Sequence, residues 1–309
     1  MPLPPLPEPS GFRRVIGVLR AIPIIIVLFT TLIGFNGLQT ISLLLLPFSR
    51  RAFRAFNRWG ANTWWGWCVS TARLAYRARI EVTGDELPMR EHVILLSNHQ
   101  QMTDITFLMF LGRSKDRLGD LKWFVKDIVK WIPGVGWGML FLDCLFVKRD
   151  WAADRASIER TFARINQGCV PLWLMNFPEG TRIRPHKLER SNEFARSKGL
   201  APLKHLLIPR TKGFAASAQG LRGHLHAVYD VTIGYVNGVP SLWQYIKGYA
   251  QVAHMHVRRF AIDELPEAEE ALTRWLHERW QEKDLLLEHY YAHGAFPASA
   301  PATAAGAEV

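Results

Sequence analysis

The sequence has 309 residues, enough for one large domain or two small ones, and 49% of them are hydrophobic against 21% charged. This composition, with 12 Trp and 17 Phe, excludes a disordered, collagen-like or disulfide-scaffold protein. Lys and Arg outnumber Asp and Glu by 38 to 27, and the net charge of +11 favours a polyanionic partner, either nucleic acid or an anionic lipid surface. The 3 Cys are too few and too scattered for a disulfide framework or a CxxC metal pair, which fits a reducing compartment.

The N-terminal part of the chain favours lipid over nucleic acid. Residues 1–12 are Pro-rich and are expected to be disordered, whereas residues 21–49 carry no charge and are too long for the apolar region of a signal peptide. At about 1.5 Å per residue, such a helix would extend about 43 Å, more than the ~30 Å hydrocarbon core. The segment therefore fits one tilted span or a re-entrant hairpin bent near Asn36-Gly37, and a buried soluble helix is the remaining alternative. Because arginines flank both ends, the positive-inside preference favours the hairpin, with both flanks on the cytoplasmic side.

Residues 50–79 interleave seven arginines with aromatic side chains. This pattern is typical of the lipid headgroup layer, where rings anchor and arginines meet phosphate. The alternatives are a core helix that packs its rings inward and a single-stranded nucleic-acid surface, although no RNP-like, zinc-finger or helix-turn-helix motif supports the latter. We therefore expect residues 13–78 to form a membrane-anchoring helical hairpin with a basic-aromatic interfacial segment, and we expect no nucleic-acid partner.

The pattern changes after Gly84 to short apolar runs alternating with helical stretches, which predicts an α/β domain over residues 79–292 with a mixed central sheet flanked by helices. The expected strands are residues 79–82, 92–97, 121–125, 144–148, 170–176, 205–209, 228–236 and 250–257. The expected helices are residues 104–111, 153–167, 213–219 and 267–289. Residues 293–309 are rich in Ala and Pro and are expected to form a disordered tail.

A first polar cluster, SNHQQMTD, follows the expected strand 92–97 directly. Strand ends are where α/β sheets place ligands. On one continuous helix His99 and Asp104 would point apart, but across a strand-turn-helix corner the carboxylate can fold back onto an imidazole nitrogen. That arrangement makes a base and its orienting group, although a merely structural hydrogen-bonded corner is the alternative.

A second cluster, NFPEGTR, follows the expected strand 170–176. Pro178 and Gly180 force a turn in which backbone amides can approach a ligand, and Thr181 and Arg182 add a hydroxyl and a guanidinium. The cluster predicts an anion pocket, with an ordinary Pro-Glu-Gly turn as the alternative. A carboxylate beside an anion is awkward unless Glu179 orients Arg182 or accepts a hydrogen bond from a hydroxyl.

Together, in this order, the two clusters resemble the glycerophospholipid acyltransferase family, which includes the 1-acylglycerol-3-phosphate acyltransferases. Residues 131–137 look like that family's Pro-Gly turn, residues 145–151 like a block that ends in a basic pair, and residues 207–209 like a strand that ends in proline. The longer stretches 207–214 and 229–235 are similar to the branch that contains lysocardiolipin acyltransferases. Gln101 departs from the pattern, because many members carry serine there.

The resemblance implies a role for each matching residue. His99 takes the proton of an attacking hydroxyl, Asp104 fixes its tautomer, and Asn98 and Pro178 support the two turns. The glycerol phosphate is held by a larger set, namely Glu179, Gly180, Thr181 and Arg182, with Lys148 and Arg149 as further phosphate contacts. The chain contains no GxSxG nucleophile elbow, so no covalent acyl-enzyme is expected, and neither a cofactor nor a metal site is expected.

The sequence therefore predicts a membrane-attached acyltransferase whose catalytic domain lies on the cytoplasmic side. The donor is acyl-CoA or an acyl carrier protein, and the acceptor is a lysophospholipid, in the first place lysophosphatidic acid. Reacylation of lysocardiolipin or another lysophospholipid is the enzymatic alternative. A non-catalytic lipid-binding scaffold is the alternative from another class.

Overall fold

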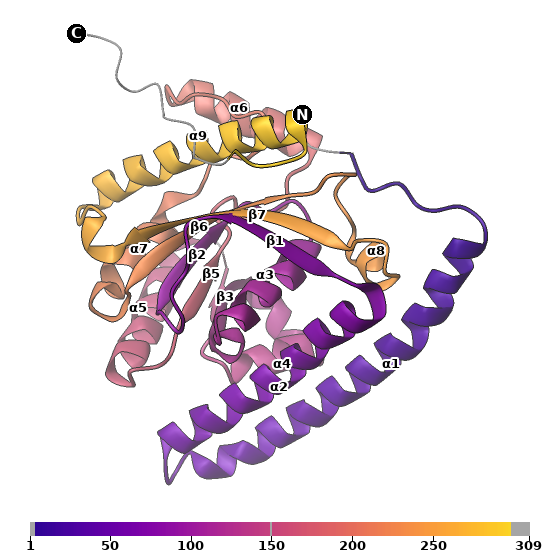
Figure 1. The fold of residues 1–309 in the computed structure, drawn as a ribbon. Coiled ribbons are helices and arrows are strands. Elements are labelled where there is room, and N and C mark those ends of the chain that lie inside the picture. Colours follow the sequence, from indigo (N-terminus) through magenta and orange to yellow (C-terminus); the bar gives the residue numbers. More distant parts are fainter. Residues whose placement is uncertain (1–3, 149, 298–309) are drawn as a thin grey trace.

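The structure is a computed structural model that describes residues 4–148 and 150–297 (Figure 1). Within these residues the strands form a mixed sheet in the order β1-β7-β6-β2-β5-β3-β4, which confirms the expected fold class. The strands are β1 (Arg79–Gly84), β2 (Val93–Ser97), β3 (Leu121–Lys126), β4 (Leu145–Val147), β5 (Trp173–Asn176), β6 (Ala227–Gly234) and β7 (Val252–Ala261). Neighbouring strands run parallel except β6 and β7, which pair antiparallel.

Helices cover both faces of this sheet (Figure 1). They are α1 (Phe12–Ile41), α2 (Arg50–Tyr76), α3 (Thr103–Ser114), α4 (Val135–Leu140), α5 (Trp151–Gln167), α6 (Pro185–Ser197), α7 (Thr211–Gly220), α8 (Leu242–Ile246) and α9 (Glu269–His293). Helices α2 and α3 pack on one face, and α5, α7 and α9 pack on the other. The result is a helix–sheet–helix sandwich with two apolar layers.

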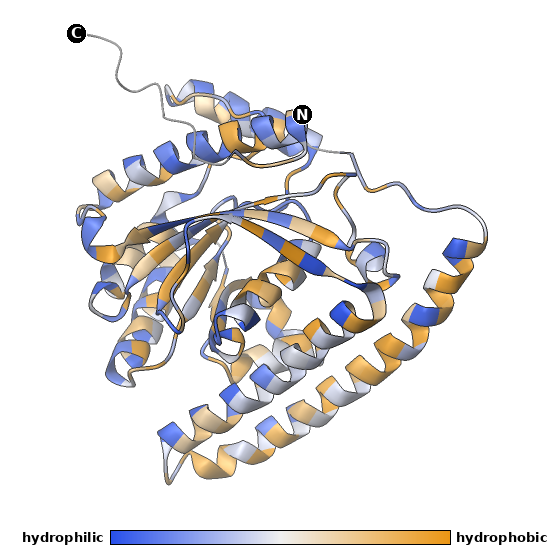
Figure 2. Cartoon of the chain, viewed as in Figure 1, coloured by the Kyte–Doolittle hydropathy of each residue, from blue (hydrophilic) through white to orange (hydrophobic). Residues whose placement is uncertain are grey.

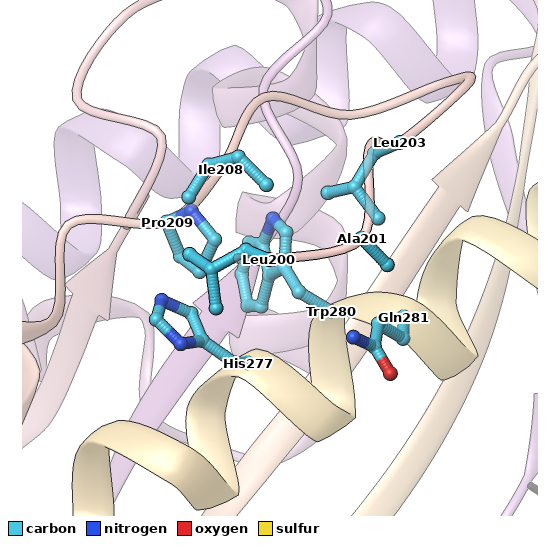
Figure 3. Close-up of a pocket in the computed structure, with 8 residues that line it drawn as sticks. All are labelled: Leu200, Ala201, Leu203, Ile208, Pro209, His277, Trp280 and Gln281. Atoms are coloured by element: carbon cyan, nitrogen blue, oxygen red, sulfur yellow. The ribbon is translucent and has the colours of Figure 1, made fainter. Parts of the chain in front are cut away.

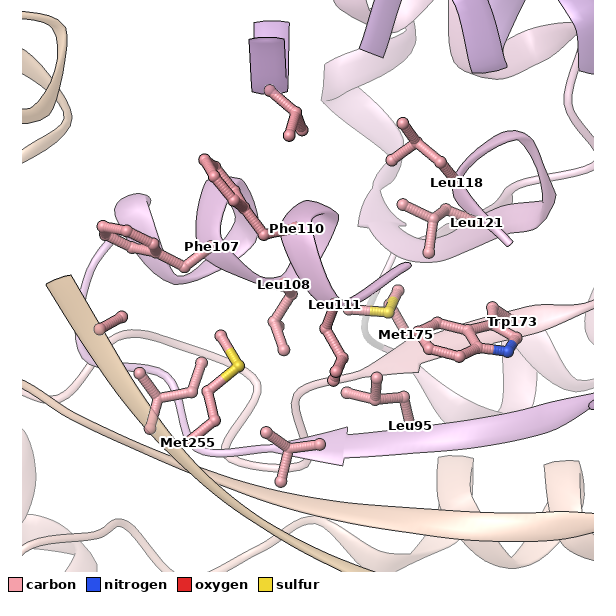
Figure 4. Close-up of a cluster of buried hydrophobic side chains, with 14 of the residues drawn as sticks. Leu95, Phe107, Leu108, Phe110, Leu111, Leu118, Leu121, Trp173, Met175 and Met255 are labelled. Atoms are coloured by element: carbon pink, nitrogen blue, oxygen red, sulfur yellow. The ribbon is translucent and has the colours of Figure 1, made fainter. Parts of the chain in front are cut away.

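The central strand β2 shows how the sequence builds both layers. Its residues are all buried, and alternate side chains point to opposite faces of the sheet. Val93 and Leu95 join the layer under α2 and α3, where Figure 4 shows Leu95 below Leu108 and Leu111 of α3. The intervening Ile94 joins the layer under α5, α7 and α9. A strand buried on both faces reads as a continuous apolar run, which is why it was recognisable in the sequence.

The functional motifs gather at one edge of the sheet because β5 and β6 both run parallel to β2. The carboxyl ends of these three strands lie side by side, so the segment that follows β2 lies next to the segment that follows β5. Strand β3 is parallel to β5 and also ends at this edge. The sheet therefore brings together residues about 80 positions apart in the chain.

The helical hairpin at the N-terminus differs from the expected one in the position of its turn. Helix α1 continues through Asn36-Gly37 without a bend, and the chain reverses only between its end and Ser49, which caps α2. The helix continues because Asn36 donates a hydrogen bond to the Gln39 side chain at 3.0 Å, and the Gln39 amide in turn reaches the carbonyl of Gly138. Both polar side chains face the protein body instead of interrupting the helix.

Helix α1 is the apolar segment recognised in the sequence. Within the described residues, one helical stretch, Phe12–Leu45, is long and apolar enough to cross a membrane. Figure 2 shows its hydrophobic colouring along nearly the whole length, beside the more mixed α2. It packs along α2, where the Trp64 indole donates a hydrogen bond to the Leu28 carbonyl at 3.1 Å.

The segment before α1 is not disordered where the structure describes it. The Leu6 N–H donates to the Val239 carbonyl at 3.0 Å, and Lys247 pairs with Glu8 at 3.0 Å. At the other end, α9 extends to His293, and Phe296 is buried against Tyr290. The expected tail from residue 293 is therefore ordered as far as 297, and the rest of it lies outside the described residues.

The expected strand 205–209 is an irregular segment instead. Side chains take up its backbone donors: Asp284 accepts from His205 at 2.7 Å, and the Ser191 hydroxyl accepts from Ile208 at 2.8 Å. With these donors satisfied, the segment needs no partner strand. Ser191 belongs to α6, a helix that the sequence analysis did not anticipate.

A small cavity lies between this segment and α9, lined by Ile208, Pro209 and Trp280 among others (Figure 3). It encloses about 10 Å³, which suits at most about one water molecule. A lipid substrate therefore has to bind elsewhere.

Candidate active site

The turn after β2 begins with an asparagine that continues the sheet. The Asn98 side chain donates to the Ile233 carbonyl at 3.0 Å and accepts from the Ile233 N–H at 2.8 Å, as a strand residue would. Asn98 is fully buried. It fixes where the chain leaves β2 and thus the position of His99, the next residue.

Asp104 organises the turn from the first turn of α3. One of its oxygens accepts the backbone N–H groups of Gln100 and Gln101, at 2.7 and 2.8 Å. The same oxygen lies 3.0 Å from the Nδ1 atom of His99, so the carboxylate folds back as the spacing suggested. The other oxygen accepts from the Tyr235 hydroxyl at 2.8 Å. Burial raises the pKa of Tyr235 well above its ordinary value, so this phenol stays a donor.

The His99 ring is held on two sides. Asp104 accepts from Nδ1, and the ring stacks on Phe177 with centroids 4.3 Å apart. With Nδ1 as the donor, Nε2 carries the lone pair of the neutral imidazole. The His99 side chain is 12% exposed, whereas its partner Asp104 is fully buried. Buried groups therefore orient the imidazole ring, which still reaches the surface. This is the geometry of a general base and its orienting carboxylate.

The Glu179 side chain binds backbone groups outside its own turn. One of its oxygens accepts the backbone N–H of His99 at 2.9 Å, and the other accepts that of Leu207 at 3.1 Å. The residue is 3% exposed, and burial raises its pKa to about 8, although the two backbone donors act in the opposite direction. The expectation that Glu179 contacts phosphate or orients Arg182 is therefore corrected. Both of its oxygens position the backbone around the base.

The turn after β5 carries Arg182 and brings Gly180 beside the Arg210 side chain. Gly180 has a φ of +66°, a conformation that favours glycine, and a Cβ there would lie 3.2 Å from the Arg210 side chain. Arg210 is held in place because its N–H donates to the Pro178 carbonyl at 2.8 Å. Arg182 donates to the Gln101 side chain at 2.6 Å, which links the two motif turns directly.

The cations of this turn have few acidic neighbours. In the part of the chain that the structure describes, no carboxylate pairs with Arg182 or Arg210. Lys187, at the start of α6, donates to the Thr181 hydroxyl at 2.6 Å. Among the described residues, Arg182 and Arg210 are thus two guanidinium groups without a paired carboxylate beside one backbone turn, which suits a phosphate.

Lys148, a further phosphate candidate, does not join this cluster. Lys148 follows the edge strand β4, which β3 and β5 separate from β2. Its backbone N–H donates to Asp154 at 2.8 Å, and its side chain is exposed. Arg149 lies outside the described residues. The structure therefore gives no contact that would bring Lys148 to the anion turn.

Comparisons with known proteins agree with this geometry. A family model described as "Acyltransferase" matches residues 79–236, and one described as "Acyltransferase C-terminus" matches residues 244–306. The probable 1-acyl-sn-glycerol-3-phosphate acyltransferase 5 of Arabidopsis thaliana is 31% identical over 295 residues, covering 93% of this chain and 78% of its own. The human 1-acyl-sn-glycerol-3-phosphate acyltransferase gamma is 34% identical over 273 residues, covering 85% and 71%. The chain belongs to the acyltransferase family.

A solved structure supports the fold of this acyltransferase. The crystal structure of the 1-acyl-sn-glycerophosphate (LPA) acyltransferase PlsC from Thermotoga maritima superposes with a TM-score of 0.52 and covers 86% of this chain and 94% of its own. The sequence identity is 17%, so the likeness concerns the fold. The first family model spans the residues from β1 to the end of β6, and thus both motif turns.

Sequence reasoning missed three groups that complete the acyltransferase site. Tyr235 lies in a stretch that resembles the family, yet its hydrogen bond to Asp104 depends on how β6 pairs with β2. Arg210 directly follows residues 207–209, which were expected to end a strand. Gln101 stood out only as a departure from serine, and nothing in its spacing indicates the contact with Arg182.

Proposed function

We propose that this acyltransferase transfers a fatty acyl chain from an acyl thioester to the free hydroxyl of lysophosphatidic acid and forms phosphatidic acid. One observation carries the proposal: the turn that contains the base His99 also contacts Arg182, the proposed anion-binding residue of the other turn. Asp104 orients His99, and Gln101 of the same turn accepts a hydrogen bond from Arg182. An acceptor with a hydroxyl near a phosphate matches this pair of groups. The names of the relatives, 1-acyl-sn-glycerol-3-phosphate acyltransferases, support the same acceptor.

The reaction follows from the position of the histidine. As the acceptor oxygen attacks the thioester carbonyl carbon, His99 Nε2 takes the hydroxyl proton. A C–O ester bond forms and the C–S bond breaks. The thiolate leaves readily because the pKa of a thiol is about 8.5, and the proton passes from His99 to the thiolate. An alcohol activated in this way attacks directly, so no acyl-enzyme intermediate is needed.

The positive charge that develops on His99 is stabilised by Asp104, whose buried carboxylate lies 3.0 Å from Nδ1. Glu179 contributes indirectly by holding the His99 backbone. It is a positioning residue, because its oxygens are used by backbone donors and not by substrate. The base is thus fixed through both its ring and its main chain.

The acceptor phosphate binds at the turn around Gly180. Arg182 offers a planar fork to the phosphate oxygens, and the Arg210 side chain lies against Gly180 of the same turn. Lys187 and Thr181 add a third cation and a hydroxyl. This arrangement orients the glycerol so that its free hydroxyl faces His99.

Helix α1 attaches the enzyme to the cytoplasmic face of a membrane without crossing it. The contacts at both of its ends support this topology. Tyr249 lies against Gly17 near the start of α1, and Gly134 lies against Leu32 in its second half. A helix held to the body at both ends lies along it, as an in-plane anchor does. The arginines at both flanks agree with one cytoplasmic side.

A purified full-length enzyme assay tests this function. Lysophosphatidic acid, lysocardiolipin and lysophosphatidylcholine are each offered with acyl-CoA and with acyl carrier protein thioesters, and the products are identified by mass spectrometry. We expect the highest kcat/KM for lysophosphatidic acid. A preference for lysocardiolipin would show that the proposed acceptor is wrong. No turnover with any donor and acceptor would favour the alternative of a lipid-binding scaffold.

A further inference from the structure

The segment between β3 and β4 exposes an unusual number of large apolar side chains. It consists of a short 3₁₀ helix (Asp127–Trp131), a Pro-Gly turn and α4, and we refer to residues 127–140 as the apolar loop. The exposed side chains are Ile128 (67%), Trp131 (70%), Ile132 (50%), Val135 (46%), Trp137 (42%) and Leu140 (53%). Single exposed apolar residues are ordinary, but a contiguous group marks a surface that is normally covered.

The apolar loop has a defined conformation and is not a loose end. A Cβ on Gly136 would lie 1.8 Å from the Val129 carbonyl oxygen, so the two halves of the loop pack closely. The backbone of Gly136 also donates to the Ile132 carbonyl at 3.0 Å. Its tryptophans are therefore presented to the outside by a fixed backbone.

The loop is continuous with the apolar surface of α1. A Cβ on Gly134 would lie 2.7 Å from Leu32 and 3.8 Å from Ile33. Ile33 belongs to a stripe of exposed side chains at helical spacing on α1, which also contains Ile22, Ile26 and Phe29. The apolar surface of the anchor thus extends onto the loop, which belongs to the catalytic domain.

We propose that the apolar loop enters the same lipid leaflet as α1, with Trp131 and Trp137 at the level of the headgroups and acyl chains. The bilayer is the occupant that explains both surfaces at once, because the apolar stripe on α1 ends against this loop. Tryptophan is enriched at that boundary, where its ring is buried and its N–H stays hydrated. This inference rests on the proposed attachment of α1 to a membrane.

The apolar loop lies at the same edge of the sheet as the candidate active site. The loop begins at the carboxyl end of β3, the edge at which the turns after β2 and β5 also lie. A leaflet that covers α1 and the loop therefore lies beside the edge that carries His99 and Arg182. A lysophospholipid can reach that edge by lateral diffusion while its acyl chain remains in lipid.

Site-directed spin labelling of the full chain tests the proposal. Cys68→Ala and Cys169→Asn remove the half-buried and the exposed thiol, whereas Cys144 can stay because it is buried. Single cysteines then replace Trp131 and Trp137 of the loop. Phe29 of α1 is the positive reference, and Leu285 of α9, which is 45% exposed, is the matched control. In Figure 1, α9 and α1 lie on opposite sides of the molecule.

Collisions of each label with oxygen and with a water-soluble nickel chelate are compared with and without vesicles of phosphatidylcholine and phosphatidylglycerol. On adding vesicles, we expect the labels at 131, 137 and 29 to lose nickel accessibility and gain oxygen accessibility, while the label at 285 is unchanged. If 29 responds but 131 and 137 behave like 285, the loop proposal is overturned and the α1 anchor stands. If 29 also stays aqueous, the proposed attachment itself fails. Protection of 131 and 137 without vesicles, increasing with protein concentration, would assign the surface to a second copy of the chain.

A charge substitution provides an independent measurement. Trp131→Asp should weaken partitioning of the full chain onto the same vesicles about tenfold, whereas Leu285→Asp should not. Equal partitioning of the two variants would contradict the proposal. Circular dichroism of both variants checks that they fold.

Discussion

The Glu179 carboxylate accepts the backbone N–H of His99 at 2.9 Å, although the two residues are 80 positions apart in the chain. Its second oxygen accepts the N–H of Leu207, so one buried side chain joins three loops at the carboxyl edge of the sheet. Removing this carboxylate therefore disturbs the position of the base before it disturbs phosphate binding. The motif turn thus contains both Glu179, which positions the backbone of His99, and Arg182, the proposed anion contact.

Glu179 should also make stability depend on pH. Because its pKa is raised to about 8 in the folded protein, against about 4.3 in an unfolded chain, the native state holds the extra proton between these values. Stability then falls as pH rises through this window, by at most about 1.4 kcal/mol per pH unit. Glu179→Gln has no such proton, so the excess Tm of the wild type over this variant should shrink from pH 5 to pH 8. A constant or growing difference would contradict the assignment.

Substitutions of His99 and of its partner Asp104 should lower kcat by different amounts. We expect His99→Ala to lower kcat about 100-fold or more, because it removes the base that we propose takes the hydroxyl proton. Asp104→Asn should lower kcat less but still substantially, since Tyr235 and the turn N–H groups still hold the side chain. Turnover by purified enzyme gives kcat, and vesicle binding shows that the membrane attachment is intact. Near-normal turnover of His99→Ala would contradict the assignment of His99 as the general base.

Arg210 should act on the acceptor and not on the donor. Its side chain lies against Gly180, so Arg210→Ala should raise the KM for lysophosphatidic acid about tenfold, as expected for one charge-assisted hydrogen bond. Arg196→Ala is the matched control, because Arg196 is also exposed but lies at the far end of α6. Steady-state kinetics with each substrate varied in turn gives both KM values. An equal rise in both, or an equal effect of the control, would show that Arg210 is not a phosphate contact.

The topology of α1 can be decided on intact cells. Single cysteines at Ser10 and Ser299, in a background without other cysteines, are treated with an impermeant thiol reagent. We expect neither to be labelled until the cells are lysed, because residues 4–8 contact the catalytic body and so share its side of the membrane. Labelling of Ser10 alone would mean that α1 spans the membrane.

The sequence predicted those features that depend on local pattern. The strand-turn-helix corner led to the contact between Asp104 and His99, because the two residues are close in the chain and a strand end precedes them. The apolar runs of β2 and β5 were recognisable because strands buried on both faces carry apolar residues continuously. Five further expected segments also overlap strands of the sheet.

The features that were not predicted depend on contacts between distant residues. Asn36-Gly37 looked like a break, but Asn36 and Gln39 turn to the body, and Gln39 contacts Gly138 about 100 residues away. The segment 205–209 looked like a strand, yet Asp284 and Ser191 satisfy its donors from two different helices. In each case a deciding partner, the Gly138 carbonyl or the Asp284 side chain, lies far along the chain, where no short pattern can indicate it.

The central claim is that a phosphate-bearing acceptor is recognised beside the histidine base, and one ratio tests it most directly. For wild-type enzyme and for Arg182→Ala, kcat/KM is measured with lysophosphatidic acid and with a monoacylglycerol of the same chain, which lacks the phosphate. The account predicts that the wild type prefers lysophosphatidic acid and that Arg182→Ala reduces this preference at least tenfold, because a charge-assisted contact contributes about 1.5 to 3 kcal/mol. Arg182→Lys should restore it only in part, since lysine lacks the planar fork. An unchanged ratio in Arg182→Ala would contradict the account.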